Sequence, residues 1–140
     1  MMNYPAVKDV DLVGSYPALV HSGGGYVWDD VLEYRVWCHP HDGAPDIEEG
    51  NDYYYVFDNF EEALAYSKSN LGTESPLALI LQKEYINESE PGIYVHVKKE
   101  RLTEWPVEFL KRPKRTSKTI SDFISPNAPA NKLEILRGLM

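Results

Sequence analysis

The sequence predicts an α+β fold, with a mainly antiparallel sheet of four or five strands, one mid-chain helix and C-terminal helices. Runs rich in β-branched and aromatic residues predict the strands, at 31–39, 53–57, 77–85 and 93–98. Apolar residues at helical spacing over 59–69 predict the helix. Clusters of turn-forming residues separate these runs, so the chain is expected to alternate short elements without an internal repeat.

The first two predicted strands, 31–39 and 53–57, should pair as a wide hairpin, because an acidic loop rich in turn formers joins them. The strand at 77–85 begins with a nearly continuous apolar run, which is typical of a central position in a sheet. A Pro-Gly turn at 91–92 follows it, and we expect the next strand, 93–98, to pair antiparallel with it.

The mid-chain helix has recognisable start and stop signals. Asp58 is a good N-cap residue, and Glu61 stands three residues later, as in a capping box. Acidic residues in the first turn and Lys68 in the last turn match the helix dipole. Asn70 and Gly72 are expected to end the helix.

The whole chain, 1–140, is predicted to form a single domain, because its length fits one ordinary domain with its own core. Within it, residues 1–20 are expected to form a weakly ordered arm. Residues 111–140 should form a basic, helical tail, with a short helix at 116–124 and a last helix over 129–137.

Charge is unevenly distributed along the chain. The net charge is −8, with 17 acidic and 4 basic side chains in residues 1–97 but 5 acidic and 10 basic ones in 98–140. The acidic body argues against nucleic-acid binding, because most of its surface would repel phosphate. We therefore expect the basic tail to lie over the acidic body, with a phosphate-binding or membrane-surface patch as the alternative.

The composition indicates a reducing compartment. The single cysteine, Cys38, cannot form an internal disulfide. No basic segment followed by an apolar one is seen at the N-terminus, and the longest apolar run, 77–81, is far shorter than the roughly 20 residues that span a bilayer. We expect a cytoplasmic protein that does not insert into a membrane.

The most unusual local sequence is His21-Ser22-Gly23-Gly24-Gly25. Consecutive glycines adopt backbone conformations closed to other residues and let another group approach the backbone closely. Such a run serves either as a turn between arm and body or as a small concavity of N–H groups that binds an anion. It is neither a Walker loop nor a dinucleotide fingerprint, because no Gly-Lys-Ser/Thr follows and the Gly-x-Gly-x-x-Gly spacing is absent.

The segment Cys38-His39-Pro40-His41-Asp42 contains four side chains of types that bind metals. Adjacent side chains on a strand point to opposite faces, so Cys38 and His39 should diverge, and we predict no metal site. Cys38 is expected to be an inert core thiol, with a nucleophile beside a histidine base as the alternative.

Three consecutive tyrosines occupy the second strand, and Tyr53 and Tyr55 share one of its faces. Tyrosine suits a half-buried pleated surface, so a structural role is the simpler interpretation. The alternative is a stacking platform for a planar ligand.

Five patterns extend over most of the chain: His-Ser-Gly-Gly-Gly at 21–25, Glu-Tyr-Arg-Val-Trp-Cys-His-Pro at 33–40, Asp-Tyr-Tyr-Tyr at 52–55, Glu-Glu-Ala-Leu-Ala at 61–65 and Leu-Thr-Glu-Trp-Pro-Val at 102–107. Together they resemble a group of small bacterial proteins identified as GNAT-type N-acetyltransferases. The resemblance implies acetyl transfer, although the acetyl-CoA loop of that family, Arg/Gln-x-x-Gly-x-Gly/Ala, has no counterpart here.

A weaker pattern consists of Tyr34-Arg35 on an early strand, an aromatic strand running into an Ala-rich helix over 55–66, and a late glutamate, Glu90 or Glu104. This pattern resembles ADP-ribosyltransferase-like domains: Glu88-Ser89-Glu90 matches their Glu-x-Glu, but their Ser-Thr-Ser element is missing here. The resemblance implies ADP-ribosyl transfer from a nucleotide-containing cofactor.

The leading interpretation is a binding or interaction module of a bacterial cell, acting as a homodimer or as an accessory partner of another protein. The alternative is a small transferase that uses a nucleotide-containing cofactor for acetyl or ADP-ribosyl transfer. Its catalytic candidates are His21, Arg35 and Glu104, and its cofactor-binding candidates are Ser22, Gly23, Gly24, Tyr53 and Tyr55. A cleft lined by such residues would favour the transferase, and a flat apolar patch would favour the module.

Overall fold

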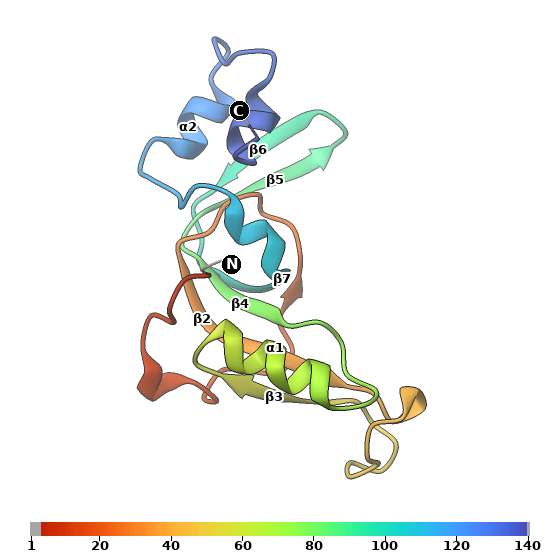
Figure 1. Ribbon diagram of the computed structural model, residues 1–140. Helices are drawn as coiled ribbons and strands as arrows, with labels where there is room; N and C mark the ends of the chain where they lie inside the picture. Colours follow the sequence, from red (N-terminus) through yellow and green to blue (C-terminus); the bar gives the residue numbers. More distant parts are fainter. Residues whose placement is uncertain (1–3, 140) are drawn as a thin grey trace.

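A computed structural model describes residues 4–139 (Figure 1). The main sheet consists of β1 (His21–Ser22), β2 (Asp30–Cys38), β3 (Tyr53–Phe57), β4 (Leu77–Gln82) and β7 (Arg101–Pro106), in the order β1-β7-β4-β2-β3. A second sheet is the hairpin of β5 (Tyr85–Glu90) and β6 (Ile93–Val97). The helices of this part of the chain are α1 (Phe60–Ser69), α2 (Thr119–Ile124) and α3 (Lys132–Leu136), with 3-10 segments η1 (Val10–Leu12), η2 (Pro40–Asp42) and η3 (Val107–Lys111).

The α+β class is confirmed, but the main sheet is mixed. β2 pairs antiparallel with β3 and β4, and β4 pairs antiparallel with β7. β1 instead runs parallel to β7, with His21 opposite Thr103 and Ser22 opposite Glu104. The chain reaches this edge from the N-terminal arm, so no tight hairpin forces β1 to be antiparallel to its neighbour.

The predicted hairpin of the first two strands is confirmed as β2 and β3, whereas the predicted pairing of 77–85 with 93–98 is wrong. The segment predicted as one strand, 77–85, is interrupted after Gln82: β4 ends there, and β5 leaves the main sheet to pair with β6. The bend at Lys83 is held by its N–H, which donates to Asp29 Oδ2 at 2.7 Å. β4 therefore lies between β2 and β7, in the central position that its apolar sequence predicts.

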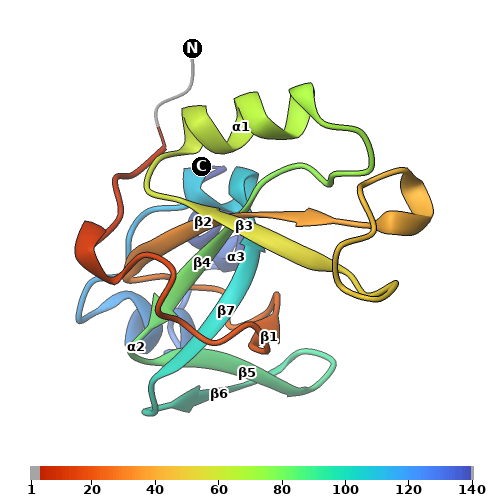
Figure 2. The same ribbon diagram turned by 90° about the horizontal axis from the view of Figure 1, so that it is seen from below.

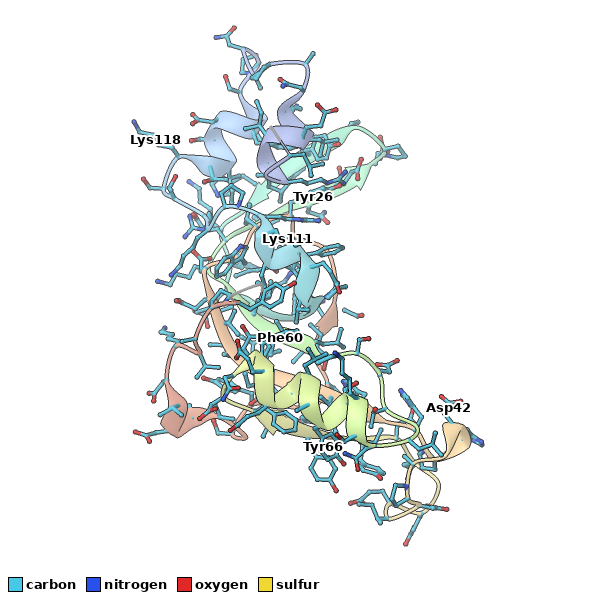
Figure 3. The ribbon with its side chains drawn as sticks, in the orientation of Figure 1. Tyr26, Asp42, Phe60, Tyr66, Lys111 and Lys118 are labelled. Atoms are coloured by element: carbon cyan, nitrogen blue, oxygen red, sulfur yellow. The ribbon has the colours of Figure 1, made fainter. Side chains whose placement is uncertain are left out.

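Helix α1 begins one residue later than predicted. Asn59, not Asp58, is the N-cap, because its Oδ1 accepts the N–H of Glu62 at 2.8 Å. Asp58 instead accepts a hydrogen bond from the Asn59 side-chain amide at 2.8 Å. Phe60 and Tyr66 of α1, labelled in Figure 3, pack against the buried core of the sheet.

The two faces of the main sheet are covered differently. Helix α1 lies across one face (Figure 2), over a core that includes Tyr34, Val36, Ile80 and Trp105. The opposite face carries a smaller cluster built on Leu32, Leu79 and Leu81, against which Tyr16 and Val20 of the arm pack. Arm and helix thus enclose the sheet between them.

The C-terminal helices extend the molecule away from α1. α2 and α3 lie beside the β5–β6 hairpin, at the end of the molecule far from α1 (Figure 1). The core of this part is made of Val27, Ile86, Ile120, Phe123 and Leu136, which are all buried. The tail therefore packs onto Val27 and Ile86 of the body in a small hydrophobic cluster separate from the core under α1.

The basic tail is fastened to the acidic body, as expected from the charge distribution. Arg115 Nε lies 2.9 Å from Asp29 Oδ1, and its Nη1 lies 2.9 Å from Glu84 Oε2. Lys114 Nζ lies 3.2 Å from Asp30 Oδ1. Asp29 and Arg115 are mostly buried, so their pair is protected from screening by salt.

The helices are short. α1 has ten residues, α2 six and α3 five. Isolated helices of this length are marginal in water, so tertiary packing supplies most of their stability. Within residues 4–139, no helix has the length and apolar character needed to cross a membrane.

Candidate functional site

Two predicted catalytic residues, Arg35 and Glu104, meet on the face of the sheet opposite α1. Arg35 Nη1 lies 3.0 Å from Glu104 Oε2, and Arg35 Nε donates to Glu33 Oε2 at 2.7 Å. Trp37 Nε1 donates to the same Glu104 oxygen at 2.8 Å, and the ring of Tyr54 lies 4.6 Å from the guanidinium carbon. These five residues are called the arginine cluster below. Residues 33, 35 and 37 alternate along β2, which places all three side chains on one face.

The arm segment 14–20 covers the arginine cluster. Arg35 Nη2 donates to the carbonyl of Pro17 at 2.6 Å, and Nη1 donates to that of Ala18 at 3.3 Å. The N–H of Gly14 donates to Glu33 Oε1 at 2.8 Å. Each guanidinium nitrogen already has a protein acceptor, and the side chains of Arg35 and Glu33 are fully buried. We infer that Arg35 ties the arm to the sheet, which leaves it little capacity to bind a ligand.

The glycine run adjoins this cluster through β1. Gly23, Gly24 and Gly25 have φ angles of +74°, +84° and +83°, in the left-handed region that favours glycine. A Cβ at Gly25 would overlap the Gln82 side-chain amide, so only glycine fits there. Gln82 Nε2 and Trp105 Nε1 both donate to the Gly24 carbonyl, at 3.1 and 3.0 Å, which fixes the run on the body.

A polar cavity of about 450 Å³ opens beside the run, and it is called the glycine cavity below. Its volume falls within the range of small-molecule sites. It is lined by His21, Ser22, Gly23, Gly24, Gly25, Tyr26, Ile86, Asn87, Glu88 and Arg101. Four predicted site residues, His21 to Gly24, are therefore together in one cavity.

Arg101 is the guanidinium of the glycine cavity. Its Nε donates to Gln82 Oε1 at 2.7 Å, and its guanidinium carbon lies 4.1 Å from the centre of the Tyr85 ring. In the part of the chain that the structure describes, its two Nη atoms make no hydrogen bond or ion pair. Nη2 lies beside the run, because a Cβ added at Gly24 would be 3.2 Å from it. Burial lowers the pKa of Arg101, yet a guanidinium stays protonated at neutral pH.

Glu88 is the carboxylate of the same cavity. Its Oε2 accepts the N–H of Gly92 at 2.8 Å, and its Oε1 accepts the hydroxyl of Tyr26 at 2.8 Å. These two bonds, the first above all, lower the pKa of Glu88 and keep it ionised. Burial and the bond to Glu88 raise the pKa of Tyr26 to about 12, so its hydroxyl stays a donor. Tyr26 also has a φ of +67°, an uncommon conformation for a residue with a side chain.

The other two cofactor-binding candidates lie elsewhere. Tyr53 and Tyr55 stand opposite Cys38 and Val36 in the β2–β3 register, and so point to the face that α1 covers. Their ring centres are 5.8 Å apart, and that of Tyr55 lies 5.2 Å from that of Tyr66 in α1. The three rings meet edge to face, and the fold does not bring them into the glycine cavity.

Cys38 and His39 diverge, as strand alternation predicts. Cys38 is buried, and burial raises the pKa of its thiol. His39 Nδ1 lies 2.9 Å from Asp52 Oδ1, and its Nε2 lies 3.3 Å from Glu74 Oε1. The hydrogen bond to Asp52 is the main cause that raises the pKa of His39. Among residues 4–139, no group of three or more His, Cys, Asp or Glu side chains is arranged to hold a metal ion.

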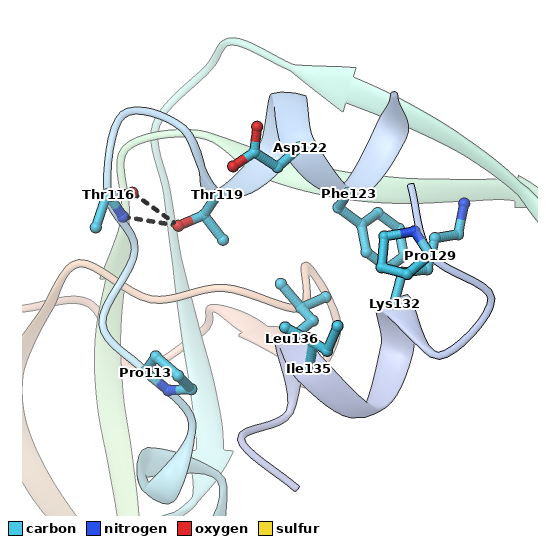
Figure 4. A pocket seen from close by; sticks show the side chains of 9 residues that line it. All are labelled: Pro113, Thr116, Thr119, Asp122, Phe123, Pro129, Lys132, Ile135 and Leu136. Atoms are coloured by element: carbon cyan, nitrogen blue, oxygen red, sulfur yellow. Dashed lines mark hydrogen bonds between the residues drawn. The ribbon is translucent and has the colours of Figure 1, made fainter. Parts of the chain in front are cut away.

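A second hollow, of about 250 Å³, lies between α2, α3 and the segment before α2 (Figure 4). Its lining is mostly apolar and consists of Pro113, Thr116, Thr119, Asp122, Phe123, Pro129, Lys132, Ile135 and Leu136. Thr116 and Thr119 hydrogen-bond to each other, so their polar groups are partly occupied. None of the predicted site residues lies here, and the hollow offers fewer polar groups for specific recognition than the glycine cavity.

Of the two charged residues of the glycine cavity, Arg101 escaped the sequence patterns, whereas Glu88 stands in the short Glu-x-Glu match at 88–90. Arg101 shares a face of β7 with buried Thr103 and Trp105, and an arginine in such a half-buried alternation is a signal that could have marked it. The sequence predicts a turn at 87–92, but the structure continues β5 to Glu90, so Glu88 lies on a strand. Comparisons of the chain with models of protein families, with curated proteins and with solved structures found no match.

Proposed function

We propose that this protein is a small binding module that holds an anionic ligand in the glycine cavity. The observation that carries the proposal is Arg101, a half-buried guanidinium that has free Nη donors among the described residues and lies beside Gly24. An anion such as a phosphate or carboxylate has the geometry to accept both Nη donors at once. His21 and Ser22 add further polar groups at the rim.

Electrostatics favours an anion at this place. The side chain of Arg101 is partly withdrawn from water, and no carboxylate lies within ion-pair distance of it among the described residues. Withdrawing a cation from water without a partner costs free energy, which an incoming anion would recover. The stacking on Tyr85 and the bond to Gln82 hold the guanidinium in place, so little side-chain entropy is lost on binding.

The glycine run supports the same function through its backbone. Gly24 has no side chain to keep a ligand at a distance, and its N–H is not a donor in any hydrogen bond of the described residues. Backbone N–H groups in left-handed and turn conformations form concavities that bind anions. The run is held in place, because the Gly24 carbonyl accepts hydrogen bonds from both Gln82 and Trp105.

A transferase with a nucleotide-containing cofactor is the second candidate. One observation favours it: Ser22 of the cavity pairs with Glu104, one of the predicted catalytic residues. The pyrophosphate of such a cofactor would occupy the anion site. The occupied donors of Arg35 and the 12% exposure of the Glu104 side chain argue against catalysis there without movement of the arm.

A thermal-shift and calorimetric panel tests the proposal, with phosphate, pyrophosphate, acetate, NAD and acetyl-CoA as ligands. A ligand at 100 times its Kd adds about 2.7 kcal/mol, which raises the Tm by several degrees. We expect at least one anion to bind wild type and to bind Arg101→Met about tenfold or more weakly. Lys68→Met, which removes an exposed charge on α1, is the matched control and should bind like wild type.

Amide spectra make the test independent of the stability of the Arg101 variant. In a 15N-labelled wild-type sample, the Gly24 amide should shift on addition of the anion, whereas that of Gly50, in a distant loop, should not. Arg101→Lys keeps the charge but not the paired donors, and it should bind with intermediate affinity. If no anion binds wild type, or if binding is the same in Arg101→Met, the proposal is wrong. Binding of NAD or acetyl-CoA alone would favour the transferase.

A further inference from the structure

Glu88 and Arg101 carry opposite charges in the same cavity, yet they form no ion pair. The ion pairs of the described residues, at up to 4.0 Å, include neither side chain. Arg137 acts on Glu88 through space and helps to lower its pKa, but it lies outside ion-pair distance. The cavity therefore presents a guanidinium and a carboxylate that are both without a direct charged partner.

Both charged groups are fixed by other contacts, which explains why they do not meet. Arg101 is held by Gln82 and by the Tyr85 ring. Glu88 is held by the hydroxyl of Tyr26 and the N–H of Gly92. The cavity between them has a volume of about 450 Å³, enough for a small ligand.

We propose that the glycine cavity recognises a zwitterion, a small molecule with an anionic group and a primary ammonium group. The anionic group lies on the Nη atoms of Arg101 and the N–H of Gly24, as in the function proposed above, on which this inference rests. The ammonium group lies on the carboxylate of Glu88. Asn87 and Ser22 also line the cavity and supply neutral hydrogen-bonding groups.

A charged amine suits Glu88 better than a hydroxyl group does. The Glu88 oxygens accept neutral hydrogen bonds from Tyr26 and Gly92, and Tyr94 is a further side-chain partner. An ionised carboxylate has about four acceptor sites, so capacity for another donor remains. Hydrogen bonds between two ionised groups are roughly twice as strong as those between neutral groups. A sugar phosphate would satisfy the lone pairs but would bring no positive charge to this exposed carboxylate.

The test uses a series of ω-amino acids whose two charges are progressively further apart: glycine, β-alanine, 4-aminobutyrate, 5-aminopentanoate and 6-aminohexanoate. Each is compared by calorimetry with the simple carboxylate of the same chain length and with the matching alkylamine. We expect one length to bind about tenfold or more tightly than its carboxylate, with affinity falling for shorter and longer members. That length reports the distance between the two charged groups of the site.

Variants separate this inference from the function on which it rests. Glu88→Gln keeps a hydrogen-bond acceptor and the size of the side chain but removes its charge. In this variant the ω-amino acid should bind no better than the simple carboxylate of the same length. The affinity for that carboxylate should stay within about twofold of wild type. Glu90→Gln, an exposed residue of the same strand outside the cavity, is the matched control and should keep the preference. Arg101→Met should weaken every anion of the series. Melting temperatures of all variants confirm that they are folded.

The outcomes are distinct. If amino acids and carboxylates of equal length bind equally, the zwitterion inference is overturned, while anion binding in the cavity stands. If the preference survives in Glu88→Gln, the ammonium site lies elsewhere and the inference is again overturned. If neither carboxylates, amino acids nor phosphate bind wild type, both this inference and the proposed function fail.

Discussion

Arg35 and Glu104 form an ion pair across the main sheet, with 3.0 Å between Nη1 and Oε2, although β4 separates their strands. The same guanidinium also forms an ion pair with Glu33, so two carboxylates contact one cation. The Trp37 indole N–H donates to the Glu104 carboxylate. The N–H of Gly14 and the indole N–H partly compensate the excess negative charge. The same guanidinium holds the arm through the carbonyls of Pro17 and Ala18. The pair therefore links three parts of the chain that are far apart in sequence.

Removal of this guanidinium should be strongly destabilising. Arg35→Met leaves the fully buried Glu33 and the mostly buried Glu104 without their cation, and breaking a buried pair in this way costs about 3–5 kcal/mol. Urea unfolding measures the loss in the free energy of unfolding. Lys68→Met, the exposed control, should change it by less than about 0.5 kcal/mol.

A triple variant tests whether charge burial is the cause. Arg35→Met combined with Glu33→Gln and Glu104→Gln removes the uncompensated charges, so it should recover part of the stability lost in Arg35→Met alone. A loss of less than about 1 kcal/mol in the single variant, or no recovery in the triple variant, would contradict the role given to the cluster.

Gly25 should tolerate alanine less well than a glycine of the same backbone conformation. Gly25 and Gly50 have φ angles of +83° and +84°, so a Cβ costs both sites about 1–2 kcal/mol in backbone strain. Only at Gly25 does the Cβ overlap Gln82, whose amide bonds Gly24, Val27 and Arg101. Gly25→Ala should lose about 2 kcal/mol more than Gly50→Ala in urea unfolding. Equal losses would mean that Gln82 moves aside without cost.

Local patterns predicted the elements, and the missed features depend on how the elements are arranged. The runs at 53–57 and 59–69 became β3 and α1 because their composition and spacing match strand and helix. The cap was misplaced by one residue, because Asp58 and Asn59 are both good caps and the sequence does not distinguish them.

Contacts across the sheet were beyond sequence analysis. Arg35 and Glu104 were both predicted site residues, but they are 69 residues apart, and their contact depends on the strand order. The same holds for the glycine cavity, which brings the run at 23–25 beside β5 and the start of β7. The parallel β1 is only two residues long and has no compositional signature. Tyr53 and Tyr55 were assigned to one face correctly, but only the packing of α1 reveals what covers that face.

Cys38 should be nearly inert in the folded protein. Its side chain is 1% exposed, and burial raises the pKa of the thiol, so both access and the thiolate fraction are reduced. We expect reaction with a thiol-specific disulfide reagent to be at least about a hundredfold slower in native buffer than in denaturing urea. Rapid modification of the native protein would show that the end of β2 at Cys38 opens readily.

Stability should depend on pH through His39. Asp52 and Glu74 raise the pKa of His39 above its ordinary value of 6.5, so the folded state binds the proton more tightly than the unfolded state. The resulting stabilisation is fully present below pH 6.5 and is lost as the pH rises through the folded-state pKa. Because the pair is partly exposed, the gain should stay below about 1 kcal/mol.

The difference in unfolding free energy between wild type and His39→Gln isolates this contribution. It should be larger at pH 5 than at pH 8.5, since the imidazolium is protonated only at the lower pH. Asp52→Asn removes the main hydrogen-bond acceptor, so it should flatten the same pH profile while leaving the histidine in place. A difference that is constant across this range, or one that grows with pH, would mean that the contacts of His39 do not favour its charged form.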